Sequence, residues 1–150
     1  MERARRAGEL PGFTGNLGAV LARAGRLSGR LYGELLEPLG LTPAQAAILG
    51  SLECRGEAAV GELAAMWRVK APVVTPMMRG LEERGYVKRR PDPEDGRRSI
   101  MVVTEGGREV LREVREIQGQ ALERVTAGLT EEEAGKLREY LIRVIEALED

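Results

Sequence analysis

The segment from Val60 to Thr104 restricts the possible fold more than any other part of this 150-residue chain. It begins with apolar residues at helical spacing, namely Leu63, Ala64 and Trp67. A short break follows, and Pro72 suits the first turn of a new helix. That helix has its own apolar face, formed by Val74, Met77, Met78 and Leu81, and Gly85 is expected just past its end. The spacing therefore predicts two short helices joined by a tight turn.

Two runs with strand composition come next, at residues 86–90 and 99–103. Between them, Pro91-Asp-Pro-Glu-Asp-Gly96 has the residues of a turn, so the pair predicts a β-hairpin. A helix-turn-helix followed by a hairpin is typical of a winged helix. We therefore expect a mainly α fold of the α+β winged-helix type. In such a fold the second helix enters a DNA major groove and the hairpin, or wing, reaches a neighbouring groove.

Long helices are predicted on both sides of the winged helix. Residues 13–39 and the two segments between residues 104 and 149 carry apolar residues every three or four positions. Thr42, Pro43 and Gln45 form a capping box that begins the helix before the helix-turn-helix. The long helices have more apolar surface than a small winged helix covers, so we expect it to bury against a second subunit. A monomeric bundle is the alternative.

The expected organisation thus has three parts. Residues 41–104 form the DNA-binding winged helix, and residues 13–39 and 104–149 form a helical dimerisation region, all within a single family domain over residues 13–149. Residues 1–12 are expected to be a flexible arm, whose Arg3, Arg5 and Arg6 can add phosphate contacts. No apolar run is long enough to span a membrane, and no signal sequence is recognisable. We therefore expect a cytoplasmic protein without membrane contact.

Composition removes most kinds of catalysis. The chain has no histidine, which excludes the commonest general base and the commonest metal ligand. It has one cysteine, Cys54, so no intramolecular disulfide or cysteine-based zinc site can form. We expect Cys54 to be a half-buried apolar residue rather than a redox switch. No catalytic residues, no metal and no cofactor are predicted, and an enzyme has the least support among the functions considered.

Charge is distributed unevenly along the chain, although the net charge is only −1. Residues 68–98 contain nine basic and five acidic residues, whereas residues 104–150 contain seven basic and twelve acidic ones. The basic block coincides with the helix-turn-helix and the wing. This distribution favours a DNA-binding function for that part of the chain.

The same segment resembles the MarR family of bacterial transcription regulators. The most specific shared pattern is Asp95-x-Arg97 in the wing, seven to nine residues before Thr104. Further matches are Leu63-Ala64, Val69, Pro72, Val74-Thr75, Leu81-Glu82, Gly85-Tyr86-Val87, Arg89, Asp92-Pro93 and Thr104-Glu105. The flanking helices also stand where the family has them. The resemblance implies a homodimeric regulator, most often a repressor, that binds a palindromic operator and is released by a small ligand.

The second helix departs from the family's common Ser-x-Pro-Thr-Val-Thr-Arg pattern. Lys70 replaces the capping hydroxyl and adds a cation that can reach phosphate. Val73 replaces a polar residue with an apolar one suited to a thymine methyl group. Thr75-Pro76-Met77 is similar to the peroxide-sensing branch of the family. That branch carries a reactive cysteine in its first helix, and residues 13–39 have none, so we do not transfer its redox mechanism.

The candidate DNA contacts divide by role. Thr75 and Arg79 share the outward face of the second helix, where base edges would lie, while Lys70, Lys88, Arg89 and Arg90 would meet phosphates. Arg97 follows the wing tip and suits a narrow minor groove, with Asp95 orienting it through a charge-assisted hydrogen bond. The predicted DNA-binding set is Lys70, Val73, Thr75, Pro76, Arg79, Lys88, Arg89, Arg90, Asp95, Arg97 and Arg98.

A small-molecule effector is also expected, between the winged helix and the long helices. The family resemblance places it there, and the predicted lining is Leu27, Leu31, Tyr32, Leu49, Trp67 and Val110. Such a lining suits a small aromatic or lipophilic anion. The alternative function is a winged-helix module that binds protein without specific DNA binding. The several arginines around the hairpin argue against it, because a protein-binding wing does not need them.

Overall fold

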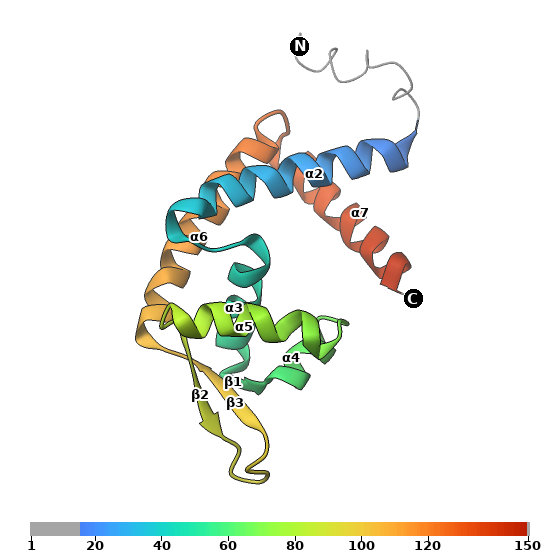
Figure 1. The fold of residues 1–150 in the computed structure, drawn as a ribbon. Helices are drawn as coiled ribbons and strands as arrows, with labels where there is room; N and C mark the ends of the chain where they lie inside the picture. The colour runs from blue at the N-terminus through green and yellow to red at the C-terminus, as the bar shows by residue number, and fades with distance from the viewer. Residues whose placement is uncertain (1–15, 150) are drawn as a thin grey trace.

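The computed structural model describes residues 16–149 and shows a winged helix carried on long helices (Figure 1). The order of elements is α2 (Leu17–Leu36), a 3-10 turn η1 (Glu37–Leu39), α3 (Pro43–Arg55), β1 (Glu57–Ala59), α4 (Val60–Met66), α5 (Ala71–Glu83), β2 (Val87–Pro91), β3 (Ser99–Val103), α6 (Glu105–Thr126) and α7 (Glu131–Glu149). The expected fold class and the positions of the two helices and the hairpin are confirmed.

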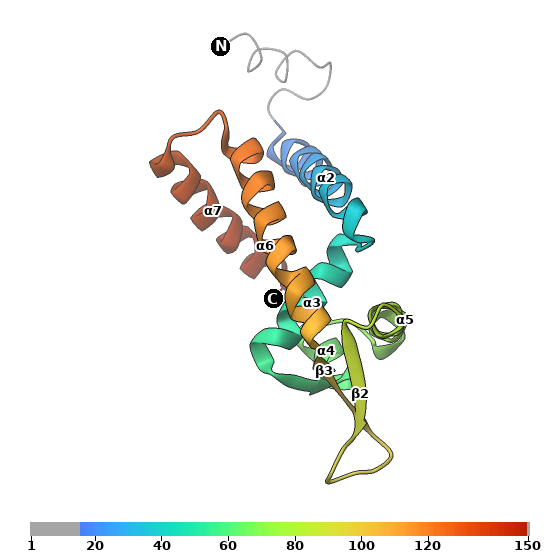
Figure 2. The same ribbon diagram turned by 90° about the vertical axis from the view of Figure 1, so that its left-hand side faces the viewer.

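The winged helix, residues 41–104, is called the head below. Its small antiparallel sheet has the order β1-β3-β2, so β3 lies between the other two strands. Arg90 pairs with Ile100 and Lys88 with Val102 across the hairpin. The hairpin projects away from the long helices at the far end of the molecule in both views (Figures 1 and 2). Its tip is therefore free to reach a partner alongside α5.

One apolar cluster fills the head and extends to the start of α6. Its fully buried members come from every element of the head, and they include Ile48, Leu49, Leu52, Leu63, Met78, Leu81 and Met101. The cluster continues into Val110, Leu111 and Val114 of α6 and into Leu36 of α2. Leu, Val, Ala and Met side chains dominate it, in keeping with an aromatic content of only 3% in the sequence. The long helices are thus attached to the head through a shared core.

The first helix is shorter than predicted. Its start is fixed by Asn16, whose extended backbone and side-chain oxygen, accepting the Ala19 N–H at 3.2 Å, make it the N-cap. At the other end the helix stops at Leu36, and Glu37–Leu39 tighten into the 3-10 turn that contains Pro38. The prediction of one helix over residues 13–39 is therefore wrong at both ends, and residues 13–15, like the predicted arm, lie outside the described residues.

Strand β1 was not predicted. It has only three residues, Glu57 to Ala59, which is too short to show a twofold repeat, and their composition favours helix rather than strand. Pairing with β3 forms the strand, with Ala58 opposite Met101. Tertiary packing therefore determines this element, and it completes the sheet that supports the wing.

The long helices α2, α6 and α7 are called the frame below. Thr104 caps α6 and Thr130 caps α7, and both hydroxyls accept a backbone N–H three residues later. No residue of α7 is buried in the single chain. Large apolar side chains are exposed on all three helices, among them Leu17, Val20, Leu122, Val125, Tyr140, Ile145 and Leu148. No helix within residues 16–149 combines the length and apolar character needed to cross a membrane.

Candidate DNA-binding surface

Helix α5 has a buried face and an exposed face, as the spacing predicted. Val74, Met78 and Leu81 are fully buried against the head. Arg79 is exposed on the outward side and has no ion pair within residues 16–149. Thr75 is only half-buried, and its hydroxyl donates to the Ala71 carbonyl at 2.9 Å. Arg79 is therefore available to a partner, whereas the proton of the Thr75 hydroxyl is already used within the helix.

The start of α5 has the features expected from its departures from the family pattern. Lys70 occupies the N-cap position, and its side chain makes no capping hydrogen bond. Pro72 lies in the first turn, and Pro76 is accommodated inside the helix without ending it. Gly85 follows the helix with φ of 76°, a left-handed conformation that favours glycine, so its predicted role as C′ residue is confirmed.

The wing holds Asp95 and Arg97 differently from the prediction. The Asp95 carboxylate accepts the backbone N–H of Arg97 at 3.0 Å, and the Asp95 carbonyl accepts the Arg98 N–H at 2.9 Å. No ion pair joins the two side chains in the described part of the chain. The predicted charge-assisted bond to the Arg97 guanidinium is therefore wrong. Asp95 shapes the turn, and the guanidinium stays free and exposed.

Arg89 and Arg90 were predicted to meet phosphates, but both are paired within the chain. Arg89 contacts the Glu82 carboxylate of α5 at 3.4 Å, and Arg90 forms a close ion pair with Glu57 of β1. The two acidic partners were missed because they lie seven and 33 residues away, and no short sequence pattern links them. Lys88, on the same strand, is exposed and has no such partner among residues 16–149.

A groove lies between α4 and the wing, and α5 contributes Thr75 to it. It has a volume of about 570 Å³, and its lining includes Val60, Glu62 and Ala65 of α4 and Arg89, Arg97 and Arg98 of the wing. Arg98 is also 3.9 Å from the Asp92 carboxylate, so it is held near the base of the wing. Three arginines and one glutamate thus line one concave surface with a net positive charge. This surface has the charge and the shape to follow a phosphate backbone.

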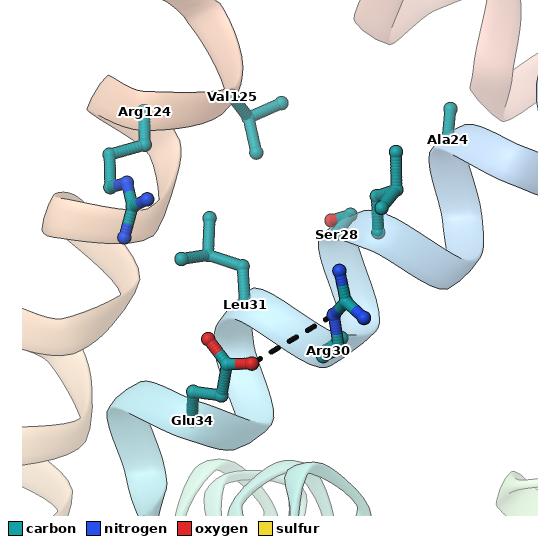
Figure 3. A pocket seen from close by; sticks show the side chains of 8 residues that line it. Ala24, Ser28, Arg30, Leu31, Glu34, Arg124 and Val125 are labelled. Atoms are coloured by element: carbon teal, nitrogen blue, oxygen red, sulfur yellow. Dashed lines mark ion pairs between the residues drawn. The ribbon is translucent and has the colours of Figure 1, made fainter.

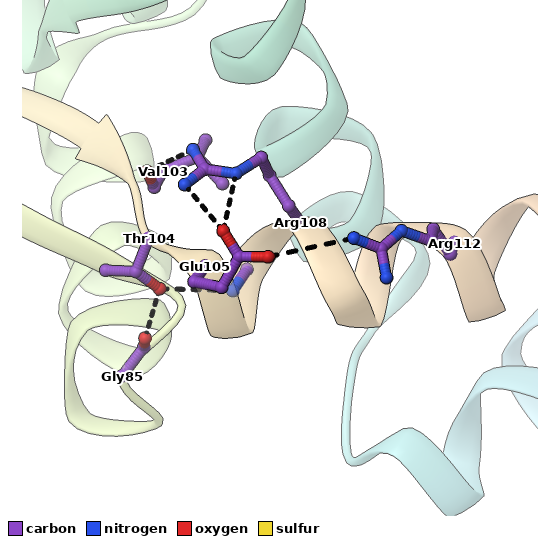
Figure 4. A network of polar contacts seen from close by, with 7 residues as sticks. Gly85, Val103, Thr104, Glu105, Arg108 and Arg112 are labelled. Carbon is purple, nitrogen blue, oxygen red and sulfur yellow. Dashed lines mark hydrogen bonds and ion pairs between the residues drawn. The ribbon is translucent and has the colours of Figure 1, made fainter.

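A polar network ties the head to α6 (Figure 4). The Thr104 hydroxyl donates to the Gly85 carbonyl at 2.5 Å and accepts the Gly107 N–H at 3.1 Å. Arg108 donates to the Val103 carbonyl at 3.2 Å and pairs with Glu105 at 3.0 Å. A Cβ on Gly107 would lie 2.2 Å from the Tyr86 carbonyl oxygen, so only glycine fits there. These contacts therefore join the end of α5, the wing and the start of α6.

A second contact links the head to the end of the frame. Arg68, in the turn before α5, has a left-handed backbone with φ of 50°, unusual for a residue other than glycine. Its guanidinium donates to the Glu149 carbonyl of α7 at 2.8 Å and lies 3.9 Å from the Glu149 carboxylate. No short sequence pattern links Arg68 to Glu149, 81 residues later, so this contact was not predicted. It places the last turn of α7 beside the helix-turn-helix.

The predicted effector lining is not gathered in one cavity. Leu49 and Val110 are buried in the apolar core, and Trp67 packs against that core and donates to Ser51 at 3.3 Å. Leu27 and Leu31 instead line a hollow of about 370 Å³ between α2 and α6, together with Ala24, Ser28, Arg30, Glu34, Arg124 and Val125 (Figure 3). Tyr32 lines a neighbouring hollow that shares Ser28 and Val125. The single predicted cavity is therefore wrong.

Cys54 is exposed rather than half-buried, so that prediction is wrong. It lies near the end of α3, and Gly56 follows the helix with φ of 88°. Cys54 follows the buried Leu52 by two positions, about 200° around the helix, so it faces away from the core. Among residues 16–149 no group of three or more acidic or cysteine side chains is placed to hold a metal ion.

Three comparisons relate this surface to known proteins. Residues 41–99, nearly the whole head, match the model of the MarR family. The chain is 32% identical over 130 residues to the multiple antibiotic resistance protein MarR of Escherichia coli (strain K12), covering 86% of this chain and 90% of that protein. It is 29% identical over 115 residues to the HTH-type transcriptional repressor IacR of Pseudomonas putida, covering 77% and 69%. A crystal structure of a mutant MarR from E. coli complexed with operator DNA superimposes with a TM-score of 0.77 at 30% identity, covering 85% of this chain and 92% of that one.

Proposed function

Because this chain belongs to the MarR family of DNA-binding transcriptional regulators, we propose that it acts as a homodimeric repressor on a palindromic operator. Its relatives are regulators, and the chain is not an enzyme. The observation that carries the proposal is the exposed, unpaired Arg79 of α5 beside a groove lined by three arginines. A similar MarR structure holds operator DNA, which supports the same use of this surface.

In this proposal the head, residues 41–104, binds DNA. The frame, which consists of α2 before the head and the helices within residues 104–149, forms the dimer interface. Helix α5 enters the major groove, where Arg79 pairs with a guanine and Thr75, Val73 and Pro76 lie close to base edges. Lys70 and Lys88 reach phosphates, and Arg97 at the wing reaches the minor groove. Arg89, Arg90 and Arg98, which have acidic partners, chiefly hold the wing in place.

A dimer is supported by the apolar side chains that the frame leaves uncovered. Tyr140, Ile145 and Leu148 of α7 expose 55%, 53% and 80% of their surface, and Leu17 of α2 exposes 78%. Soluble single chains rarely expose so many large apolar groups on neighbouring helices. A second copy would cover them and bring two heads to half-sites one helical turn apart, about 34 Å.

Selection of bound sequences from a random DNA pool tests the proposal. We expect a palindrome with two half-sites, bound by two copies of the chain. Arg79→Ala should weaken the selected duplex by about 1–3 kcal/mol per lost base contact and flatten the preference at one position in each half-site. A scrambled duplex should lose much less. A pool that shows no sequence preference would favour the protein-interaction alternative.

The hollow between α2 and α6 supports release by a lipophilic anion. Leu27, Leu31 and Val125 provide apolar walls, and Arg124 provides positive charge, whereas Arg30 is 3.8 Å from the Glu34 carboxylate, which also lines the hollow (Figure 3). Its size lies in the range of small-ligand sites. A screen of aromatic carboxylates should find compounds that weaken operator binding by the wild type and not by Arg124→Ala. Equal release of both proteins would place the effector site elsewhere.

A further inference from the structure

The exposed face of the first two turns of α5 is almost entirely apolar. Ala71, Pro72, Val73 and Pro76 are all exposed, and Val73 leaves 47% of its surface open. The one hydroxyl in these turns belongs to Thr75 and donates to the Ala71 carbonyl within the helix. In helix-turn-helix proteins these first turns are the part that meets base edges. The first two turns of α5 therefore offer few side-chain groups that could hydrogen-bond to the donors and acceptors on base edges.

Only one natural base offers an apolar group in the major groove. Thymine carries a C5-methyl group there, whereas guanine, cytosine and adenine present hydrogen-bond donors and acceptors alone. After Lys70, the first charged side chain on the outward face is Arg79, one turn beyond Thr75, whose hydroxyl proton is already used within the helix. The helix thus presents an apolar half, followed by a charged half.

We propose that Val73 and Pro76 are specificity-determining residues that select thymine methyl groups in each half-site. This inference rests on the proposed operator binding and adds which base chemistry the helix reads. A protein partner would suit an apolar patch as well, but charge argues against it. Lys70 and Arg79 flank the apolar residues, and the neighbouring groove holds three further arginines. Such a surrounding favours a phosphate backbone over an apolar protein surface.

The test replaces thymine by uracil in the selected operator. Uracil keeps the O4 acceptor and the base pair and lacks only the methyl group, so it isolates the apolar contact. Each substitution is made symmetrically in both half-sites, and affinity is measured by fluorescence anisotropy. At one or two positions per half-site we expect about a fourfold loss per methyl, roughly fifteenfold for the symmetric pair, from the burial of one carbon.

Two variants connect the effect to the residues. In Val73→Ala the ratio of thymine to uracil affinity should approach one at a single position and stay unchanged at the others. Arg79→Ala is the matched control, because it should weaken binding while keeping that ratio. Val73 is exposed, so its truncation should leave the fold intact, which circular dichroism checks.

The possible outcomes distinguish a failure of thymine selection by Val73 and Pro76 from a failure of operator binding itself. Operators in which uracil binds as tightly as thymine at every position would overturn this inference while leaving the proposed function standing. A Val73→Ala variant that keeps the full thymine preference would overturn the assignment to Val73. A selection that returns no operator would overturn the proposed function and this inference with it.

Discussion

The head and the frame use the same apolar residue types with opposite results. In the head, Leu49, Leu63 and Met78 are fully buried within one chain. In the frame, α7 buries no residue, although Tyr140, Ile145 and other large apolar side chains lie along it. The difference shows that the head is a closed unit, because its helices and sheet surround a common core. The frame leaves large apolar side chains uncovered in the single chain, and these are what the proposed dimer would bury.

The two regions also differ in charge. The head, residues 41–104, has ten basic and eight acidic residues, whereas the frame helices α2, α6 and α7 together have ten basic and twelve acidic ones. An acidic frame is repelled by phosphate, whereas the basic head is attracted. The charge distribution therefore favours an orientation in which only the head approaches DNA.

The largest effect is expected from opening a cavity in the head. Leu49 has no exposed surface, so Leu49→Ala should lower the free energy of unfolding by about 2–5 kcal/mol. Urea unfolding measures this as a shift of the midpoint at unchanged slope. Leu148→Ala is the matched control in the frame, measured at a concentration at which the chain is monomeric, because Leu148 exposes 80% of its surface in the single chain. An equal loss in both variants would contradict the distinction between a closed head and an open frame.

A charge in the frame should break the dimer without unfolding the head. Ile145→Glu places a carboxylate among exposed apolar side chains, and we expect the dimer dissociation constant to rise by roughly a hundredfold, about 2.7 kcal/mol. Analytical ultracentrifugation measures the constant. Arg143→Glu is the control, since two residues along a helix is 200° of rotation and faces the other side. If Ile145→Glu remains a dimer, α7 does not form the interface.

Much of the fold was predictable because the relevant signals are local. The capping box at Thr42, the caps at Thr104 and Thr130, and Gly85 after α5 each depend on residues within one turn of the chain. The apolar periods then placed the buried face of α5 correctly. The two ends of α2 are also marked locally, by Asn16 and by Pro38. The predicted helix was too long because apolar residues continue beyond both positions.

The parts that were missed depend on contacts between distant residues. Strand β1 exists because β3 pairs with it, and Arg90 is held by Glu57, 33 residues earlier. The effector lining failed for the same reason. Leu49 and Val110 lie on the apolar faces of α3 and α6, and the packing of the head against α6 buries both. Periodicity shows which apolar side chains share one face of a helix. It does not show which faces pack against each other in the folded chain.

A smaller effect should distinguish Lys88 from its neighbour Arg89 in the wing, because within residues 16–149 only Arg89 of the two has an acidic partner, Glu82. Lys88→Ala should reduce the salt dependence of DNA binding by about 0.9 per subunit, because one phosphate contact is lost. Arg89→Ala removes a side chain already paired with Glu82, so we expect a weaker change in that slope. Anisotropy across a salt series measures both. Equal changes would mean that Arg89 leaves Glu82 for phosphate when DNA binds.

The smallest expected effect is a loss of folding stability of the head at low pH. The Glu62 carboxylate accepts the Ala59 N–H at 2.8 Å, and this bond, with a lesser contribution from Arg55, lowers the pKa of Glu62 below 4.5 despite partial desolvation. Since the folded-state pKa is depressed, ionised Glu62 stabilises the head fully above the unfolded value. That contribution is lost as the pH falls through the lower, folded value. Glu62 is partly exposed, so solvent screening keeps the effect small.

Glu62→Gln keeps an oxygen that can accept the Ala59 N–H but removes the titration. The wild type should be more stable than this variant at neutral pH, and the difference should shrink as the pH falls below about 4.5. Urea unfolding is followed by the fluorescence of Trp67, the single tryptophan, which donates to Ser51 in the head. Circular dichroism, which also reports on α2, α6 and α7, runs alongside. A stability difference that stays constant with pH would show that Glu62 acts only through its neutral hydrogen bond.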